Sequence, residues 1–394
     1  MRGDRQNTSS KIRILDLTRY LPGGFCTQIW ADQGAEVIKI EEVERGDFCR
    51  LDPPFINGQS YYYLALNRNK KSMTLNLKKE EGKKIFMDLA RTADVVVENY
   101  RPGVMDRLGL GYDRLKEINP RLVYCALTGY GQDGPYREKA GHDLNFLAES
   151  GYLDMSIKCG NKIPALFLGD MAGTMYTALA IAMALLNRTR TGQGQYVDIS
   201  IFASLFSWMT LLVGRSHALG RPLEAKDLDH SGESLCYNIY RTADDRFIAL
   251  GAIEEKFWVN LCEALALTDL ISSQFVKRSQ DPDAFARLEK IFAGKTQQEW
   301  VAWAEGRDMC FSPVKSIAEA LADPDLAAQN LTYMMQVPGV GEVIQVAMPM
   351  KFSFSSDAGG NNPPPALGQH TEEILASIDI DEEERKRLKV EKVV

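Results

Sequence analysis

The chain has 394 residues, of which 45% are hydrophobic and 25% charged, and this composition is that of a globular protein with enough apolar material for a large core. Its formal net charge of −7 argues against nucleic-acid binding and against binding to a membrane surface, because both leave a basic footprint. The seven cysteines are scattered, without a Cys-x-x-Cys or Cys/His spacing, so we expect neither a disulfide framework nor a metal site.

The first residues, MRGDRQNTSSKIRILDL, are polar and charged where a signal peptide would be apolar, so we predict a cytoplasmic protein. Short apolar runs then alternate with amphipathic ones. They predict strands at 12–17, 36–41, 73–77, 94–98, 122–128 and 196–201, and helices at 24–32, 81–91, 112–118 and 172–187. This alternation predicts an α/β fold with a parallel sheet that is covered on both faces.

The predicted helix 172–187 holds the longest apolar stretch of the chain. This stretch, 172–186, contains Thr174, Tyr176 and Thr177, and it is shorter than the roughly 20 residues that a membrane-spanning helix needs. We therefore expect a buried core helix and no membrane segment.

The composition changes after about residue 219, where a polar stretch with Gly and Ser indicates a linker. A strand at 247–252 and helices at 255–267 and 297–305 predict a smaller α+β domain. Strands return near 339–353, and a charged helix follows residue 372. The predicted domain limits are therefore 1–220, 221–330 and 331–394.

A dinucleotide-binding fingerprint, Gly-x-Gly-x-x-Gly, occurs once, at 129–134, directly after the predicted strand 122–128. The residues that follow it, Pro-Tyr-Arg-Glu-Lys-Ala-Gly, do not form the apolar-periodic helix that would bind a pyrophosphate. We therefore predict a glycine-rich loop here and not a nicotinamide or flavin site. The chain also has no P-loop and no Gly-x-Ser-x-Gly elbow.

Basic and polar residues gather near the ends of two predicted strands. The stretch Asn-Arg-Asn-Lys-Lys at 67–71 precedes the strand 73–77, and Asn-Tyr-Arg-Pro-Gly at 99–103 follows the strand 94–98. Strand ends of an open α/β sheet are where ligands bind, so these residues suit the phosphates of an anionic cofactor. Ordinary surface charge is the simpler explanation from the residues alone.

Asp170 follows an apolar run and precedes a strongly apolar helix, in PALFLGDMAGTMYTALAIAMALL. Helix N-capping explains an Asp there as well as catalysis does. Three features favour a functional site: Gly169 permits close approach of a ligand, the first amides of the helix suit an oxyanion, and Gly173 leaves room. The residues alone leave both interpretations open.

His142 is one of four histidines and lies between Gly141 and Asp143, at a predicted turn that enters a helix. Such a position is accessible, although a lone histidine is more often structural. Glu254 leaves the predicted strand 247–252 in FIALGAIEEKFW, where a glutamate is usually exposed to solvent.

Six blocks of the chain, in the same order, resemble the class III (CaiB/BaiF-type) CoA-transferase family. They are LDLTRYLPGGFCTQIWADQGAEVIKIE, LNRNKKSMTLNLK, DVVVENYRPGVMDRLGLGY, LTGYGQDGPY, GDMAGTMYTALAIAMALLNRTRTGQGQYVDIS and ALGQHTEEIL. The resemblance covers the chain from about residue 11 to its end. It implies an open Rossmann-like large domain, a smaller α+β domain inserted late in the chain, a C-terminal segment that returns to the large domain, and an interlocked homodimer.

The resemblance also implies site residues. The acidic catalytic residue falls on Asp170, and the CoA-contacting positions fall on Leu75, Lys78, Asn99, Tyr100, Arg101 and Arg107. CoA enters as part of the acyl-CoA substrate, with no prosthetic group and no metal. One position departs from the pattern: Glu42 stands where relatives often carry an Arg for the adenosine end, and Arg45 is the expected substitute.

Two chemistries compete within this family. The transferases use the aspartate as a nucleophile and pass through an anhydride and an aspartyl-CoA thioester. The α-methylacyl-CoA racemases pair it with the histidine of a Gly-His-Asp block, which a glutamate in a Gly-Ala-x-Glu block supports.

This chain has Gly-His-Asp at 141–143 and Gly-Ala-Ile-Glu at 251–254, so it resembles the racemase branch. We expect racemisation of 2-methylacyl-CoA thioesters by Asp170 and His142, with Glu254 orienting His142. CoA transfer between carboxylic acids through Asp170 is the alternative. A third possibility is a catalytically silent CoA-binding subunit, and the intact Asp170 argues against it.

Overall fold

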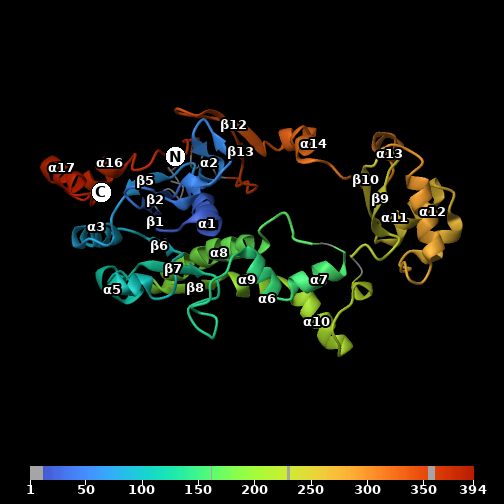
Figure 1. Ribbon diagram of the computed structural model, residues 1–394, viewed down its shortest axis with the longest axis horizontal. Helices are drawn as coiled ribbons and strands as arrows, with labels where there is room; N and C mark the ends of the chain where they lie inside the picture. The colour runs from blue at the N-terminus through green and yellow to red at the C-terminus, as the bar shows by residue number, and fades with distance from the viewer. Residues whose placement is uncertain (1–11, 161, 229–230, 354–359) are drawn as a thin grey trace, which may run out of the picture. The chain divides into compact units, whose positions relative to one another are not determined.

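The computed structural model describes residues 12–160, 162–228, 231–353 and 360–394. The chain forms two compact units (Figure 1). The first contains the residues up to Ser150, Pro164–Met209 and Ala327–Val394, and the second contains Gly151–Ile163 and Thr210–Leu326. The sequence composition predicts domain limits at 220/221 and 330/331, because the polar stretch begins after helix α10 (Thr210–Leu219). In the structure, α10 itself already packs with the second unit.

The first unit contains a six-stranded sheet in the order β5-β2-β1-β6-β7-β8, and all of its strand pairs are parallel. The strands are β1 (Arg13–Asp16), β2 (Glu36–Glu41), β5 (Lys71–Thr74), β6 (Val95–Glu98), β7 (Val123–Thr128) and β8 (Tyr196–Ser200). The predicted open α/β fold with a parallel sheet is confirmed. Strand order changes direction between β1 and β6, so the carboxyl ends of these two strands border the crevice where such sheets bind ligands.

Alternate residues of the strands point to opposite faces of the sheet, and helices bury both faces. Ile14 packs in one core with α1 (Tyr20–Asp32) and α8 (Leu168–Thr191). Leu15 packs in the other core, below α3 (Glu80–Ala90). The same core is covered by α5 (Tyr112–Ile118), α16 (Thr371–Ala376) and α17 (Glu382–Val390).

Helix α8 is longer than predicted, and only one of its faces is covered. Ile181, Ala184 and Leu185 pack on the sheet, whereas Leu179 and Met183 are 53% and 62% exposed. Of the most apolar 18-residue stretch of α8, 44% is buried. Among the described residues, α8 has the length and the apolar composition of a membrane-spanning helix. Core helices of soluble proteins can have the same length and composition.

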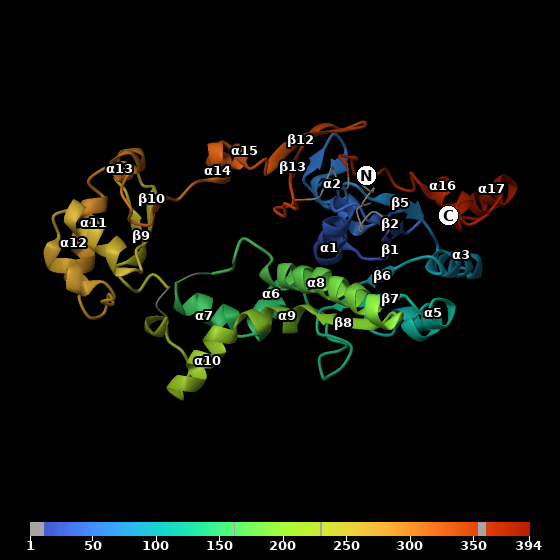
Figure 2. The same cartoon turned by 180° about the vertical axis from the view of Figure 1, so that it is seen from behind.

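The C-terminal segment joins the first unit through a hairpin beside helix α2 (Tyr61–Leu66) (Figure 2). Of the strands expected within 339–353, β13 (Gly341–Val346) lies in that range, and its partner β12 (Thr332–Val337) precedes it; the two pair antiparallel. Leu64 of α2 packs against the hairpin. The other elements of this unit are η2 (Phe48–Leu51), β3 (Phe55–Ile56), β4 (Gln59–Ser60), α4 (Val104–Arg107), α6 (Asp143–Glu149) and α9 (Ile201–Trp208).

The second unit contains an antiparallel sheet in the order β11-β10-β9, with an aromatic core of its own. Its strands are β9 (Tyr237–Arg241), β10 (Phe247–Gly251) and β11 (Phe311–Pro313). Its helices include α7 (Tyr152–Lys158), α10, η3 (Ala225–Asp227), α11 (Glu255–Ala264), η4 (Thr268–Ser273), α12 (Pro282–Phe292), α13 (Gln297–Ala304) and α14 (Ile317–Leu321), and α15 (Pro324–Ala328) follows at the junction with the first unit. Trp258 is fully buried, and its indole N–H donates to the Leu270 carbonyl at 3.0 Å.

Candidate active site

A pocket of about 630 Å³, here called the sheet-edge pocket, lies at the carboxyl ends of β1, β6 and β7 in the first unit. The turns after these strands form its wall, together with the beginnings of α6 and α8. Five of the predicted site residues line it: Asn99, Tyr100, Arg101, His142 and Asp170.

Asp170 lies in the first turn of α8, but it is not the capping residue, because Phe167 occupies the N-cap position. The capping interpretation is therefore wrong. Burial raises the pKa of Asp170 to about 7, and the charge of Asp143 adds to this shift. Within the described ranges, no hydrogen bond to its carboxylate is present. Asp170 is thus a desolvated carboxyl group that is poised to exchange a proton near neutral pH.

Asp143 connects the beginnings of α6 and α8. Its Oδ1 accepts the amide N–H groups of Gly169 and Asp170, at 2.7 and 3.0 Å. A Cβ on Gly169 would lie 3.0 Å from this oxygen, so glycine permits the contact. The prediction that these amides would serve an oxyanion is wrong, because both already donate to Asp143. The sequence marks Asp143 only as the third member of the Gly-His-Asp block, and this block is the signal that could have identified it.

Gly173 does not leave room for a ligand. A Cβ at this position would lie 2.9 Å from Cγ1 of Ile201, the first residue of α9. The missing side chain of Gly173 therefore lets α9 pack closely on α8, and this expectation too is corrected.

His142 is the N-cap residue of α6, at the predicted entry to a helix. Its backbone N–H donates to Oδ1 of Asn145 at 3.0 Å, and its side chain is exposed on the wall of the sheet-edge pocket. Because Asp143 follows His142 and bonds to the first turn of α8, His142 and Asp170 are brought to the same pocket.

Glu254 belongs to the second unit, where it is the exposed N-cap residue of α11. Gly251, at the start of the Gly-Ala-Ile-Glu block, lines a pocket of about 860 Å³ within that unit, together with Tyr237 and Cys310. The support of His142 by Glu254 stays a prediction.

The predicted CoA-contacting residues divide between two pockets. Leu75 and Lys78 line a smaller pocket of about 200 Å³, here called the side pocket. Tyr100 lines both pockets. Arg107 is exposed at the end of α4 and lines neither of them.

Asn99 holds a backbone turn with its side-chain amide. Its Oδ1 accepts the N–H of Arg19 at 2.9 Å, and its Nδ2 donates to the Arg19 carbonyl at 2.8 Å. The structure therefore uses this amide to fix the turn after β1. Sequence reasoning did not select Arg19, although it follows a strand at the edge where parallel sheets bind ligands.

Glu42 lines the side pocket, whereas Arg45 does not. The backbone N–H of Arg45 instead donates to Oε2 of Glu42 at 2.8 Å. Arg45 was expected to supply the positive charge that relatives carry at the position of Glu42, but it does not line this pocket.

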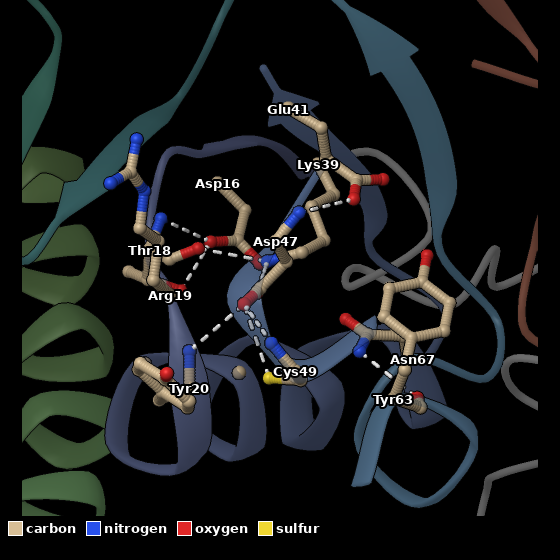
Figure 3. Close-up of polar contacts among 12 residues, drawn as sticks. Asp16, Thr18, Arg19, Tyr20, Lys39, Glu41, Asp47, Cys49, Tyr63 and Asn67 are labelled. Carbon is tan, nitrogen blue, oxygen red and sulfur yellow. Dashed lines mark hydrogen bonds and ion pairs between the residues drawn. The ribbon is translucent and has the colours of Figure 1, made fainter. Parts of the chain in front are cut away.

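A buried network of charged residues lies below the turn after β1 (Figure 3). Lys39 pairs with Asp47 at 2.6 Å and donates to the Thr18 carbonyl at 2.8 Å. Despite the cost of burial, Asp47 holds the pKa of Lys39 above its ordinary value, and Lys39 holds the pKa of Asp47 well below its own. Asp16 pairs in turn with Lys70 at 3.3 Å.

The seven cysteines are free thiols. Across residues 12–160, 162–228, 231–353 and 360–394, no group of three or more His, Cys, Asp or Glu side chains is arranged to hold a metal ion.

Comparison with known proteins identifies relatives along most of the chain. The model of CoA-transferase family III matches residues 10–371. An acyl-CoA transferase from Fusarium pseudograminearum is 38% identical, over 96% of this chain and 86% of that protein. The human succinyl-CoA:glutarate CoA-transferase is 32% identical, over 93% of this chain and 85% of that protein. The human alpha-methylacyl-CoA racemase is 33% identical, over 97% of this chain and 96% of that protein.

Among solved structures, a CAIB/BAIF family protein from Brucella suis superposes with a TM-score of 0.83 at 27% identity, covering 95% of this chain and 100% of that chain. The relatives thus include transferases and racemases, and the human representatives of the two have nearly the same identity to this chain.

Proposed function

Since the chain belongs to CoA-transferase family III, we propose that it is an enzyme of acyl-CoA thioesters that racemises 2-methylacyl-CoA. One observation carries this proposal: the desolvated carboxyl group of Asp170, with a pKa of about 7, shares a pocket with the exposed imidazole of His142. General acid–base catalysis is most effective when the pKa of the catalytic group lies near the working pH.

In the proposed reaction, ionised Asp170 removes the α-proton of the thioester from one face and forms an enolate. Protonated His142 then returns a proton to the opposite face, which inverts the α-carbon. The reverse direction exchanges the two roles. Because the amides of Gly169 and Asp170 donate to Asp143, other donors of the pocket must stabilise the enolate oxygen.

Asp170→Asn and His142→Gln test this assignment. We expect each to lower the interconversion of (R)- and (S)-2-methylacyl-CoA by roughly 100-fold or more, because a positioned acid or base contributes factors of that size. Chiral chromatography of the acyl group measures the conversion. Asp88→Asn and His217→Gln, on α3 and α10, are matched controls that should keep full activity. Full activity of Asp170→Asn would refute the site.

CoA transfer is the second candidate, favoured by the transferase relatives and by the carboxylate of Asp170, which accepts no hydrogen bond from the described residues. In this reaction Asp170 attacks the thioester carbonyl and the CoA thiolate leaves, which forms an acyl anhydride. The thiolate then attacks the Asp170 carbonyl and releases the first acid, and the second acid takes up CoA through a second anhydride. Transfer to an added carboxylic acid that persists in His142→Gln would support this candidate.

We also propose that two copies form the interlocked homodimer that the resemblance implies, and that the protein is cytoplasmic. Apolar side chains exposed along one face of α8 support the dimer, because exposed apolar patches mark interaction surfaces. They are Met175, Leu179, Met183 and Leu186.

A further inference from the structure

Arg19 occupies the junction of two pockets. It follows β1 at the point where the strand order changes direction, and it lines both the sheet-edge pocket and the side pocket. The sheet-edge pocket contains Asp170, and the side pocket contains Lys78. A long ligand that occupies both pockets therefore passes Arg19.

The guanidinium of Arg19 lies over two aromatic rings. Its Cζ lies 4.6 Å from the ring centroid of Phe48 and 5.2 Å from that of Tyr100. Within the described residues, no carboxylate lies at ion-pair distance from it, and Figure 3 shows its side chain directed away from the Lys39–Asp47 pair. One donor of the guanidinium also reaches the Tyr100 hydroxyl. A guanidinium has five N–H donors, so others remain for an anion.

The backbone at Arg19 is fixed from both sides. Asn99 binds its N–H and its carbonyl, as described above. Lys39 binds the preceding carbonyl, and Oδ1 of Asp47 accepts the N–H of Tyr20 at 3.3 Å. Tyr20 has a φ of 61°, a left-handed conformation that costs on the order of 1–3 kcal/mol for a residue other than glycine. The turn keeps this conformation because the surrounding hydrogen bonds determine it.

We propose that Arg19 binds the diphosphate of the acyl-CoA substrate, and that the Lys39–Asp47 pair and Asn99 are positioning residues for this contact. The inference rests on the proposed function, which supplies acyl-CoA as the ligand. The diphosphate lies between the nucleotide and the thioester arm of CoA, and Arg19 lies between the side pocket and the pocket of Asp170. A planar guanidinium matches phosphate oxygens with two parallel hydrogen bonds.

Calorimetric titration of the full chain with CoA and with dephospho-CoA, which lacks the 3′-phosphate but keeps the diphosphate, tests this assignment. We expect Arg19→Gln to weaken the binding of both ligands by a similar factor of roughly 10–100, the size of a charge-assisted contact. Arg19→Lys should recover part of the affinity, because it keeps the charge but not the planar fork. Arg114→Gln, which removes an exposed arginine of α5, is the matched control and should bind as the wild type does.

The outcomes separate this inference from the proposed function. Unchanged CoA binding by a folded Arg19→Gln variant overturns the role of Arg19 and leaves the proposed function in place. A loss of affinity that is seen with CoA but not with dephospho-CoA assigns Arg19 to the 3′-phosphate and overturns the diphosphate contact. A wild-type protein that binds neither ligand contradicts both the inference and the proposed function.

Discussion

Asp143 acts on Asp170 in two ways. It accepts the backbone amides of Gly169 and Asp170, which fixes the first turn of α8, and its charge adds to the effect of burial on the pKa of Asp170. The two contributions can be separated, because an amide side chain keeps an acceptor oxygen and loses the charge.

Asp143→Asn should therefore move the pH dependence of catalysis. Asp170 must be ionised to act as a base, so activity falls as the pH drops through its pKa of about 7. Removing the neighbouring negative charge lowers that pKa, so the acid limb of kcat/KM should shift to lower pH. The pH profile of racemisation measures the shift, with Asp88→Asn as control. An acid limb that stays in place or moves to higher pH would contradict this role of Asp143.

Asp170 should also reduce the stability of the fold at neutral pH. Its pKa of about 7 in the folded state lies above the ordinary aspartate pKa of 3.8. The folded state therefore binds more protons between these values, and stability falls as the pH rises through this range. Asp170→Asn should increase the free energy of unfolding by roughly 2–4 kcal/mol at pH 8 and by less at pH 5. Urea unfolding at both pH values checks this, and an equal gain at both would contradict the assignment.

At this scale, sequence reasoning selected Asp170 and His142, and the structure brings both to one pocket. It did not reveal the contacts of Asp143, Asn99 or Arg19. Each of these depends on a partner from a distant strand or helix, such as the bond from Asn99 to the backbone after β1. Neither hydrophobic periodicity nor a local motif contains that information.

Two helical glycines differ in what surrounds them. A Cβ on Gly82 of α3 would lie 2.1 Å from the Asn76 carbonyl oxygen, a backbone atom that has no freedom to move aside. A Cβ on Gly214 of α10 would meet no atom within 4 Å. The first glycine permits a close approach of two chain segments, whereas the second only lowers helix propensity.

Alanine at these two positions should change stability in opposite directions. Gly82→Ala should destabilise the protein by about 1–3 kcal/mol, because overpacking outweighs the better helix propensity. Gly214→Ala should stabilise it by up to about 1 kcal/mol. Thermal unfolding of the two variants side by side measures both, and a Gly82→Ala variant as stable as Gly214→Ala would contradict the packing.

Strands and helices with clear periodicity were predictable. The start of α1 was not, because Tyr-Leu-Pro-Gly-Gly contains poor helix formers, yet the helix begins at Tyr20. Pro22 is tolerated in the first turn, and Gly23 is required because a Cβ there would lie 2.2 Å from Cβ of Thr18. The turn that carries Arg19 is thus defined by tertiary contact.

At the scale of the molecule, packing among the described residues leaves an apolar face of α8 exposed. Leu179, Met183 and Leu186 follow one another at helical spacing and are 53%, 62% and 60% exposed. Burying such a stripe in a dimer contributes roughly 25 cal/mol for each Å² of apolar surface removed from water.

Met183→Glu should therefore weaken the homodimer without unfolding the chain. Light scattering after size-exclusion chromatography measures the mass, and we expect a dimer for the wild type and a larger monomer fraction for the variant. Val390→Glu, which changes an apolar residue with 84% exposure on α17, is the control and should stay dimeric. A monomeric wild type, or one that floats with lipid vesicles through this apolar helix, would contradict the proposed assembly.

The family and the parallel sheet followed from the sequence because ordered blocks and alternating elements cover almost the whole chain. The division between the units did not, because α7 and α10 join the second unit through tertiary contacts that composition does not mark.

The most direct test of the account is exchange of the α-proton with solvent. Wild-type protein is incubated in D₂O with (R)- or (S)-2-methylacyl-CoA, without any free carboxylic acid, and deuterium at the α-carbon is followed by mass spectrometry. We predict that both enantiomers gain deuterium and converge on the same mixture, and that Asp170→Asn abolishes this. An α-carbon that keeps its proton, combined with transfer of CoA to an acid added later, would contradict proton transfer between Asp170 and His142 and would make Asp170 a nucleophile.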